Sequence, residues 1–260
     1  MNRPVVGRWE RVKSRMKNPA EYDGSNLDKG VKEAVAHYWV TREAQGSRQK
    51  TNARSDQGAR GSVTGGAQMN GFISLLTGLI LEAGEKPENV FHNKKLELPG
   101  YFRPTKEWDL LVVRNEQLII ALEAKSQVGP SFGNNFNNRT EEAMGSALDL
   151  WTAFREGALN RTVKPWLGYF FLLEDCPGSN SPVKTREPHF PVLPEFKNAS
   201  YARRYEFFCR KLVREKHYSA SAFMKTDRLS GLAGDHTEPA DDLSFLLFVK
   251  SMIAQIAIYL

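Results

Sequence analysis

Residues 166–173 read WLGYFFLL, an apolar run without a charged side chain. A strand with one solvent-facing side alternates apolar and polar residues, so an unbroken run indicates a central strand that is covered on both faces. Two further apolar stretches, 107–113 (EWDLLVV) and 117–125 (QLIIALEAK), flank the polar residues 114–116 and predict a β-hairpin. The chain therefore has to build a sheet and cover both of its sides.

The covering layers are predicted to be helical. Apolar residues recur at helical spacing, or fill stretches long enough for a buried helix, over residues 27–43, 67–84, 139–159, 200–218 and 241–260. A short, proline-interrupted stretch at 93–102 is a candidate edge strand. This order of elements predicts an α/β fold with a mixed central β-sheet flanked by helices.

A length of 260 residues suits one large domain. Within it we expect a basic N-terminal extension over 1–25, a long polar loop over 46–66 and a functional core over 94–175. No apolar run approaches the ~18 residues needed to cross a bilayer, and the N-terminus lacks the apolar stretch of a secretory signal, so we expect a cytoplasmic location. The net charge of +6 permits a polyanionic partner without requiring one.

The second strand of the predicted hairpin ends in two charged residues, Glu123 and Lys125. Alternation along a strand points both side chains the same way, and hairpin pairing brings Asp109 toward Glu123. Two neighbouring carboxylates repel each other unless a cation separates them, and Mg²⁺ is held by one or two carboxylates, waters and phosphate oxygens. Lys125 beside such a site would orient or deprotonate a water, or stabilise a pentacovalent phosphate. The pattern therefore indicates hydrolysis of a phosphodiester.

A structural interpretation of the same residues stays open. Strands often end in charged residues at the solvent boundary, and an exposed Glu–Lys pair contributes little stability. The catalytic interpretation is favoured by the predicted context, in which a hairpin, a loop and a covering helix follow one another. The five histidines offer no competing site, since they show no zinc-binding spacing.

Several stretches together resemble the XhoI family of type II restriction endonucleases: LPGYFRPTKEWDLLVV, EAKSQVGPSFGNNFNNRTEEAMG, PWLGYFFLLEDC, PHFPV and RYEFFCRKL. The resemblance implies a homodimeric, Mg²⁺-dependent nuclease of the PD-(D/E)xK superfamily, with the superfamily's acid on Asp109 and its E-x-K on Glu123 and Lys125. One departure is visible, because the residue before the acid is Trp108 and the nearest proline is Pro104.

The resemblance also implies cleavage of duplex DNA at the palindrome CTCGAG after the first C, which leaves a 5′ TCGA overhang. It implies a cognate DNA methyltransferase that acts on the same site without needing to bind the nuclease. Some members of the superfamily take an extra metal-binding acid from the helix before the hairpin, which here would be Glu82. The other interpretation of Glu82 is a charged helix end.

Readout of such a site needs hydrogen-bonding groups for guanine and adenine edges. The candidates follow the catalytic lysine in the chain and are Gln127, Asn134, Asn135, Asn137 and Arg139. Turn formation is the alternative role for this asparagine-rich stretch, and the spacing of Asn138 and Glu141 predicts that a helix starts there.

The polar loop over 46–66 is predicted to be a clamp that orders on the duplex. Its candidate phosphate contacts are Arg48, Lys50, Arg54 and Arg60. A solvated linker without a role in binding is the alternative.

The leading hypothesis is a sequence-specific endonuclease. Two alternatives stay open at this point: a PD-(D/E)xK nuclease of DNA repair or recombination, and a non-catalytic DNA-binding protein. Digestion of long duplex DNA to discrete fragments separates the first two, and absence of Mg²⁺-dependent cleavage would favour the third.

Overall fold

The computed structural model describes residues 26–52, 67–160 and 164–259, with the side chains of 46–52 left out. The helices are α1 (Leu27–Asn52), α2 (Asn70–Glu82), α3 (Phe132–Arg155), α4 (Pro177–Asn180), α5 (Tyr201–Arg214) and α6 (Phe245–Tyr259). The strands are β1 (Val90–Phe91), β2 (Glu97–Pro99), β3 (Thr105–Glu107), β4 (Leu110–Arg114), β5 (Gln117–Gln127), β6 (Trp166–Glu174) and β7 (Ala220–Thr226). Short 3-10 helices lie at Ala67–Met69, Pro87–Asn89, Pro194–Phe196, Ser230–Ala233 and Asp241–Leu243. None of the described helices is long and apolar enough to span a membrane.

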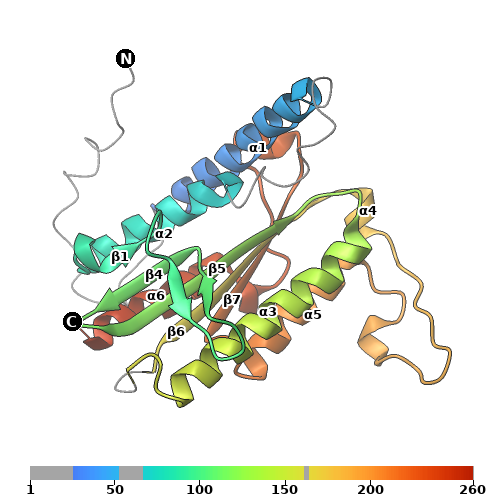
Figure 1. Cartoon of the computed structure of the whole chain (residues 1–260). Coiled ribbons are helices and arrows are strands. Elements are labelled where there is room, and N and C mark those ends of the chain that lie inside the picture. Colours follow the sequence, from blue (N-terminus) through green and yellow to red (C-terminus); the bar gives the residue numbers. More distant parts are fainter. Residues whose placement is uncertain (1–25, 53–66, 161–163, 260) are drawn as a thin grey trace.

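The strands form a five-stranded mixed sheet in the order β1-β4-β5-β6-β7 and a separate pair, β2-β3. Strands β1, β4 and β5 pair antiparallel, whereas β5, β6 and β7 pair parallel. Helices α1, α2 and α6 pack on one face of the large sheet, and α3 and α5 pack on the other (Figure 1). The predicted mixed sheet with flanking helices is therefore confirmed.

The apolar run at residues 166–173 belongs to β6, the strand between the two helical layers. All nine residues of β6 are buried, and the strand has β5 on one side and β7 on the other. Phe170 and Leu172 contribute to the core under α1, α2 and α6, while Tyr169 and Phe171 contribute to the core under α3 and α5. Both faces of β6 are thus covered, as the absence of alternation predicts.

The predicted hairpin is also present. Strands β4 and β5 pair from Leu110 opposite Leu122 to Arg114 opposite Gln117. Asn115 and Glu116 form the turn with φ values of 49° and 60°, the backbone shape of the two-residue turns that match the twist of a hairpin. The hairpin therefore places the end of β5 deep in the sheet, next to β6.

The structure corrects several of the predicted elements. Residues 46–52 continue α1, so the first part of the predicted loop 46–66 is helical, and 53–66 lie outside the described residues. Helix α3 begins at Phe132, not at Asn138. Phe136, one turn into α3, packs against Tyr205 of α5 with ring centroids 5.0 Å apart, and this packing outweighs the capping preference of asparagine.

The third correction is strand β7, which the sequence analysis missed. Its stretch ASAFMKT contains small and polar residues with low strand propensity. Parallel pairing with β6, from Gly168 opposite Ala220 to Glu174 opposite Thr226, nevertheless recruits it into the sheet. The final helix also starts later than predicted, because residues 241–243 form a 3-10 turn before α6.

One buried ion pair ties the hairpin to two other elements. Arg114, the last residue of β4, donates to the carboxylate of Glu85 and to the backbone carbonyl of Tyr259 at the end of α6. The Glu85 side chain is only 1% exposed. Burial alone would raise the pKa of Glu85, but hydrogen bonds from Arg114, Asn89 and the Lys86 amide outweigh it and hold the pKa below its ordinary value.

We predict that Arg114→Ala lowers the free energy of unfolding by about 3 kcal/mol, because it leaves a buried carboxylate without its partner. Lys32→Ala is the control, since Lys32 pairs with Asp28 on the surface and such pairs contribute roughly 0–1 kcal/mol. Urea unfolding of both variants measures the difference. Equal midpoints for the two variants would show that the buried pair is not what fastens the hairpin.

Candidate active site

Backbone pairing at the start of β4 positions Asp109 beside the end of β5. The Asp109 amide donates to the carbonyl of Leu122 at 3.1 Å, and the Ala124 amide donates to Asp109 Oδ2 at 2.8 Å. These two bonds bracket Glu123. The carboxylate of Asp109 is therefore fixed next to that of Glu123 by the hairpin itself.

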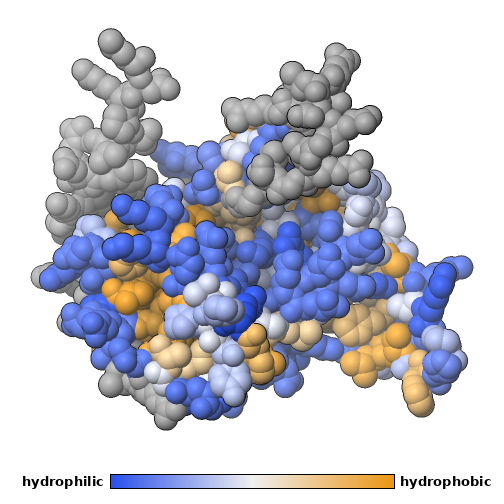
Figure 2. Space-filling model, viewed as in Figure 1, coloured by the Kyte–Doolittle hydropathy of each residue, from blue (hydrophilic) through white to orange (hydrophobic). Residues whose placement is uncertain are grey.

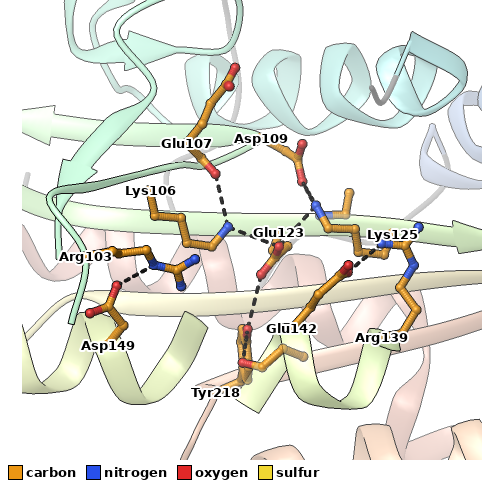
Figure 3. A network of polar contacts seen from close by, with 12 residues as sticks. Arg103, Lys106, Glu107, Asp109, Glu123, Lys125, Arg139, Glu142, Asp149 and Tyr218 are labelled. Carbon is orange, nitrogen blue, oxygen red and sulfur yellow. Dashed lines mark hydrogen bonds and ion pairs between the residues drawn. The ribbon is translucent and has the colours of Figure 1, made fainter. Parts of the chain in front are cut away.

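A single ammonium group joins the two carboxylates. Lys125 Nζ lies 3.2 Å from Asp109 Oδ2 and 3.1 Å from Glu123 Oε1. Glu123 and Lys125 thus lie on the same face of β5, as strand alternation predicts, and Figure 3 shows all three side chains converging. The described structure brings together the three residues that the sequence selected.

A second lysine completes the arrangement. Lys106 Nζ, from β3, lies 3.1 Å from Glu123 Oε1 and 4.4 Å from the ring centroid of Trp108, within the range of a cation–π contact. Lys106 and Lys125 reach Glu123 from two sides in Figure 3. Lys106 was not predicted from the sequence, although it lies in the stretch TKEW that precedes Asp109.

The charges fix the protonation states. Burial alone would raise the pKa of Glu123, but the charges of Lys125 and Lys106 outweigh it and hold the pKa below its ordinary value. Burial alone would lower the pKa of Lys125, but Glu123 and Asp109 outweigh it and raise the pKa. In this arrangement Glu123 is a carboxylate and Lys125 an ammonium at neutral pH. Lys125 is therefore a hydrogen-bond donor to both carboxylates in this arrangement.

Tyr218 donates a hydrogen bond to Glu123. Its hydroxyl donates to the Ala143 carbonyl at 3.0 Å and, more weakly, to Glu123 Oε2 at 3.4 Å. Burial raises the pKa of the Tyr218 phenol well above its ordinary value, so the group stays a donor. Nothing in the spacing of the sequence links Tyr218 to Glu123, since 95 residues separate them.

The network opens into a cleft between the hairpin and α3. Its charged lining comprises four cations and three acids: Arg103, Lys106, Lys125, Arg139, Glu123, Glu141 and Glu142. Arg139 Nη1 lies 2.6 Å from Glu142 Oε2, which places this predicted DNA-binding residue at the cleft. A cleft with cations on both walls suits a backbone phosphate.

Arg103 is held at the cleft by a buried acid. Asp149 of α3, 3% exposed, accepts hydrogen bonds from the amides of Tyr101 and Phe102 at 2.7 and 2.8 Å and from Arg103 Nε at 2.7 Å. Burial alone would raise the pKa of Asp149, but these bonds outweigh it and lower the pKa. Neither Arg103 nor Asp149 was selected from the sequence.

The remaining predicted DNA contacts divide into three groups. Asn134 and Asn137 are exposed and Asn135 is half-buried, all on the first turns of α3 and not in a loop. Gln127 is 4% exposed and accepts a hydrogen bond from Tyr205, so its side chain is not available to a base edge in this conformation. Arg48 and Lys50 lie on α1 without described side chains, and Arg54 and Arg60 lie outside the described residues.

The oxygen ligands at the site match a hard cation. Asp109 and Glu123 supply two carboxylates whose charge is balanced here by lysines, and Mg²⁺ is held by such a pair together with water and phosphate. The described residues contain no group of three or more His, Cys, Asp or Glu side chains arranged for a metal. Glu82 lies at the half-buried end of α2, where burial raises its pKa, and its metal role stays a prediction.

A family model and two curated relatives match most of this chain, and all three are restriction endonucleases. The family described as "Restriction endonuclease XhoI" matches residues 48–238. The type II restriction enzyme BstVI of Geobacillus stearothermophilus is 53% identical over 213 residues, which cover 80% of this chain and 95% of that enzyme. The type II restriction enzyme XhoI of Xanthomonas vasicola is 46% identical over 193 residues, which cover 74% of this chain and 77% of that enzyme. No solved structure matches the chain.

We predict that Asp149→Asn lowers the free energy of unfolding by about 2 kcal/mol at neutral pH, because it removes charge from three hydrogen bonds. The folded-state pKa of Asp149 is lowered, so its contribution is complete above the ordinary carboxyl pKa of about 4 and disappears as the pH falls through the lowered value. The gap between wild type and variant should therefore shrink in acid.

Urea unfolding at pH 7 and at decreasing pH measures this gap. Asp235→Asn, which changes an exposed carboxyl, is the control and should stay close to wild type throughout. A deficit of Asp149→Asn that is the same in acid as at pH 7 would contradict the assignment.

Proposed function

Because the chain belongs to the XhoI family of type II restriction endonucleases, we propose that it cleaves both strands of duplex DNA at a palindromic site in a Mg²⁺-dependent reaction. Membership of the family makes it a site-specific deoxyribonuclease acting on double-stranded DNA. The proposed site is CTCGAG, cut after the first C to leave a 5′ TCGA overhang.

The observation that carries the proposal is the convergence of Asp109, Glu123 and Lys125 beside a cleft that Glu123 and Lys125 line. Asp109 at the start of the hairpin, with Glu123 and Lys125 at its end, matches the acid and the E-x-K of the PD-(D/E)xK pattern. This match, in a mixed sheet, supports a core of that superfamily. The proposal treats the chain as a single nuclease domain over 1–260, with 94–175 as its catalytic core. Residues 1–25 form its N-terminal extension.

In the proposed reaction a water attacks the phosphorus and the bond to the 3′ oxygen breaks, which leaves a 5′ phosphate and a 3′ hydroxyl. Asp109 and Glu123 would hold Mg²⁺. When bound, Mg²⁺ neutralises phosphate charge and lowers the pKa of a coordinated water. The Lys125 ammonium stabilises the negative charge that develops on the phosphoryl oxygens.

Two further residues hold the carboxylate in place. Lys106 and the Tyr218 hydroxyl contact opposite oxygens of Glu123, so the carboxylate is oriented before substrate arrives. Preorganisation of this kind saves the cost of ordering the site at the moment of reaction. Glu82, at the end of α2, is the proposed third acid of the metal shell.

For DNA binding we propose that the exposed Asn134 and Asn137, with Asn135 and Arg139, present hydrogen-bonding groups from the start of α3 to the duplex. Residues 46–66 would act as a clamp on phosphates through Arg48, Lys50, Arg54 and Arg60. Gln127 contributes to readout only if its bond to Tyr205 breaks. A cognate methyltransferase would protect the same site.

The test of the proposed function is digestion of a sequenced plasmid with Mg²⁺, followed by mapping of the ends. We expect discrete fragments that terminate at CTCGAG with 5′ TCGA overhangs. Discrete ends at another sequence would keep the enzyme class and reject the proposed site. Random degradation would favour a repair or recombination nuclease, and intact DNA would leave a non-catalytic DNA-binding protein.

We predict that Asp109→Ala and Glu123→Ala abolish cleavage by removing proposed metal ligands. Both substitutions should also eliminate the increase in specific binding on addition of Ca²⁺, a non-catalytic substitute for Mg²⁺, while metal-free binding survives because repulsion of phosphates is reduced. Lys125→Ala should lower cleavage by ~10²-fold or more but keep the response to Ca²⁺.

Glu88→Ala and Lys250→Ala are matched controls, because neither residue belongs to the network. Plasmid cleavage and DNA binding with and without Ca²⁺ measure both effects. Near-normal cutting by Glu123→Ala or Lys125→Ala would mean that the end of β5 is only a charged boundary.

A palindromic site requires one active centre for each strand, so we predict a two-fold homodimer. Sedimentation velocity at the working concentration, with and without the duplex, measures the assembly. A stable monomer that cuts both strands in one encounter would rule out this arrangement.

A further inference from the structure

The turn between β2 and β3 carries two exposed aromatic rings. Tyr101 is 55% exposed and Phe102 is 67% exposed. The rings pack edge to face with their centroids 5.0 Å apart. Large aromatic side chains at the surface gain their full stabilisation only when something covers them, so an exposed pair on one turn indicates a contact surface.

The turn is fixed and not a loose loop. The Gly100 amide donates to the Pro104 carbonyl at 3.2 Å, and the amides of Tyr101 and Phe102 both donate to the buried carboxylate of Asp149. A Cβ at Gly100 would lie 2.5 Å from Asp149 Oδ2, so the backbone lies against that acid more closely than any other residue allows. Burying a carboxylate is costly, yet here it serves to orient two exposed rings.

The turn also lies beside the proposed reaction centre. Arg103 follows Phe102 directly and lines the same cleft as Glu123 and Lys125. Figure 3 places the Arg103–Asp149 pair next to Lys106, whose ammonium contacts Glu123. A phosphate held in this cleft would bring the adjoining sugars and bases toward the turn.

We propose that Tyr101 and Phe102 form a contact surface for the DNA duplex next to the cleaved phosphate, with the rings packing on sugars and base edges. This inference rests on the proposed function, because it assumes that the cleft holds the DNA backbone. Apolar side chains that press on a base step, flanked by cations that bind phosphates, are a recognised means of binding a duplex. Asp149 is then a positioning residue that acts through the turn.

The alternative partner for the surface formed by Tyr101 and Phe102 is a second copy of this chain. Protein–protein interfaces are depleted of lysine relative to the rest of the surface, whereas Lys106 is a close neighbour of the two rings in the chain. Figure 2 shows a face that is largely hydrophilic, with hydrophobic residues in separate patches. Both observations favour the duplex over a second copy.

The test compares wild type with the double variant Tyr101→Ala/Phe102→Ala. Fluorescence anisotropy with Ca²⁺ measures the affinity for a duplex carrying the site that plasmid mapping returns, and for a mixed-sequence duplex. We expect the double variant to bind the specific duplex roughly tenfold or more weakly, in line with the loss of aromatic contacts to bases. Its salt dependence should equal that of wild type, because no phosphate contact is removed.

Phe190→Ala is the matched control, since Phe190 is 83% exposed and lies on the separate loop after α4. It should bind within about twofold of wild type, as other surface substitutions do. Urea midpoints and sedimentation of each variant establish that folding and assembly are unchanged. Tyr101→Phe should bind like wild type, because the ring is kept.

A second readout reports on the DNA bases themselves. 2-Aminopurine placed at successive positions around the cut site should change its fluorescence on binding to wild type, and this change should disappear with the double variant. Equal affinity of wild type and double variant would overturn the proposal. Weakened binding accompanied by loss of the dimer would also overturn it, in favour of a second copy as the occupant. Failure of the proposed function is distinguishable from failure of this inference, because in the first case wild type itself would not cut the plasmid.

Discussion

The arrangement of the whole site depends on one buried carboxylate, that of Glu123. A carboxylate that is 2% exposed would be protonated or would destabilise the fold unless cations offset the loss of water. Lys125 and Lys106 provide that compensation at 3.1 Å each, and the Tyr218 hydroxyl lies on the other oxygen. The same compensation keeps Glu123 ionised, which is the state a metal ligand needs. The stability of the fold and the proposed catalysis therefore both require cations next to the Glu123 carboxylate.

The fold supplies this environment through elements that are far apart in the chain. The β4–β5 hairpin carries Asp109, Glu123 and Lys125, the small β2–β3 pair carries Lys106, and the segment before β7 carries Tyr218. Parallel pairing of β5 with β6 sets Glu123 beside Tyr169 in a buried sheet, so the end of β5 cannot move without disturbing the core. Helix α3 closes the cleft and, through Asp149, also fixes the turn that carries Tyr101 and Phe102. The proposed catalytic residues are consequently held by paired strands, whereas the proposed DNA contacts with described side chains lie at the start of α3 and on the β2–β3 turn.

Local sequence patterns were sufficient to predict the elements in which strand alternation and turn residues indicate the same structure. The apolar run of β6, the hairpin around Asn115 and the shared face of Glu123 and Lys125 follow from strand alternation and turn chemistry alone. Strand β7, the early start of α3 at Phe132 and the buried state of Gln127 did not follow, because each depends on packing against residues distant in sequence. Lys106 and Tyr218 belong to the same group, since only the assembled sheet shows that they contact Glu123. Local patterns here predict that Asp109, Glu123 and Lys125 come together, but they do not predict the residues that hold Glu123 in place.

We propose that Asp109 and Glu123 form a divalent-metal site whose charge Lys106 and Lys125 balance until the metal and the phosphate arrive. Mn²⁺ takes the same oxygen ligands as Mg²⁺, and its electron paramagnetic resonance signal separates free from bound ion. The most direct measurement is Mn²⁺ binding to wild type, Asp109→Asn and Glu123→Gln in the presence of a duplex with a non-cleavable phosphorothioate at the cut, with Glu88→Gln as the control. We expect saturable Mn²⁺ binding in wild type and in Glu88→Gln, and loss of this binding in both site variants. Undiminished Mn²⁺ binding by Asp109→Asn and Glu123→Gln would contradict it.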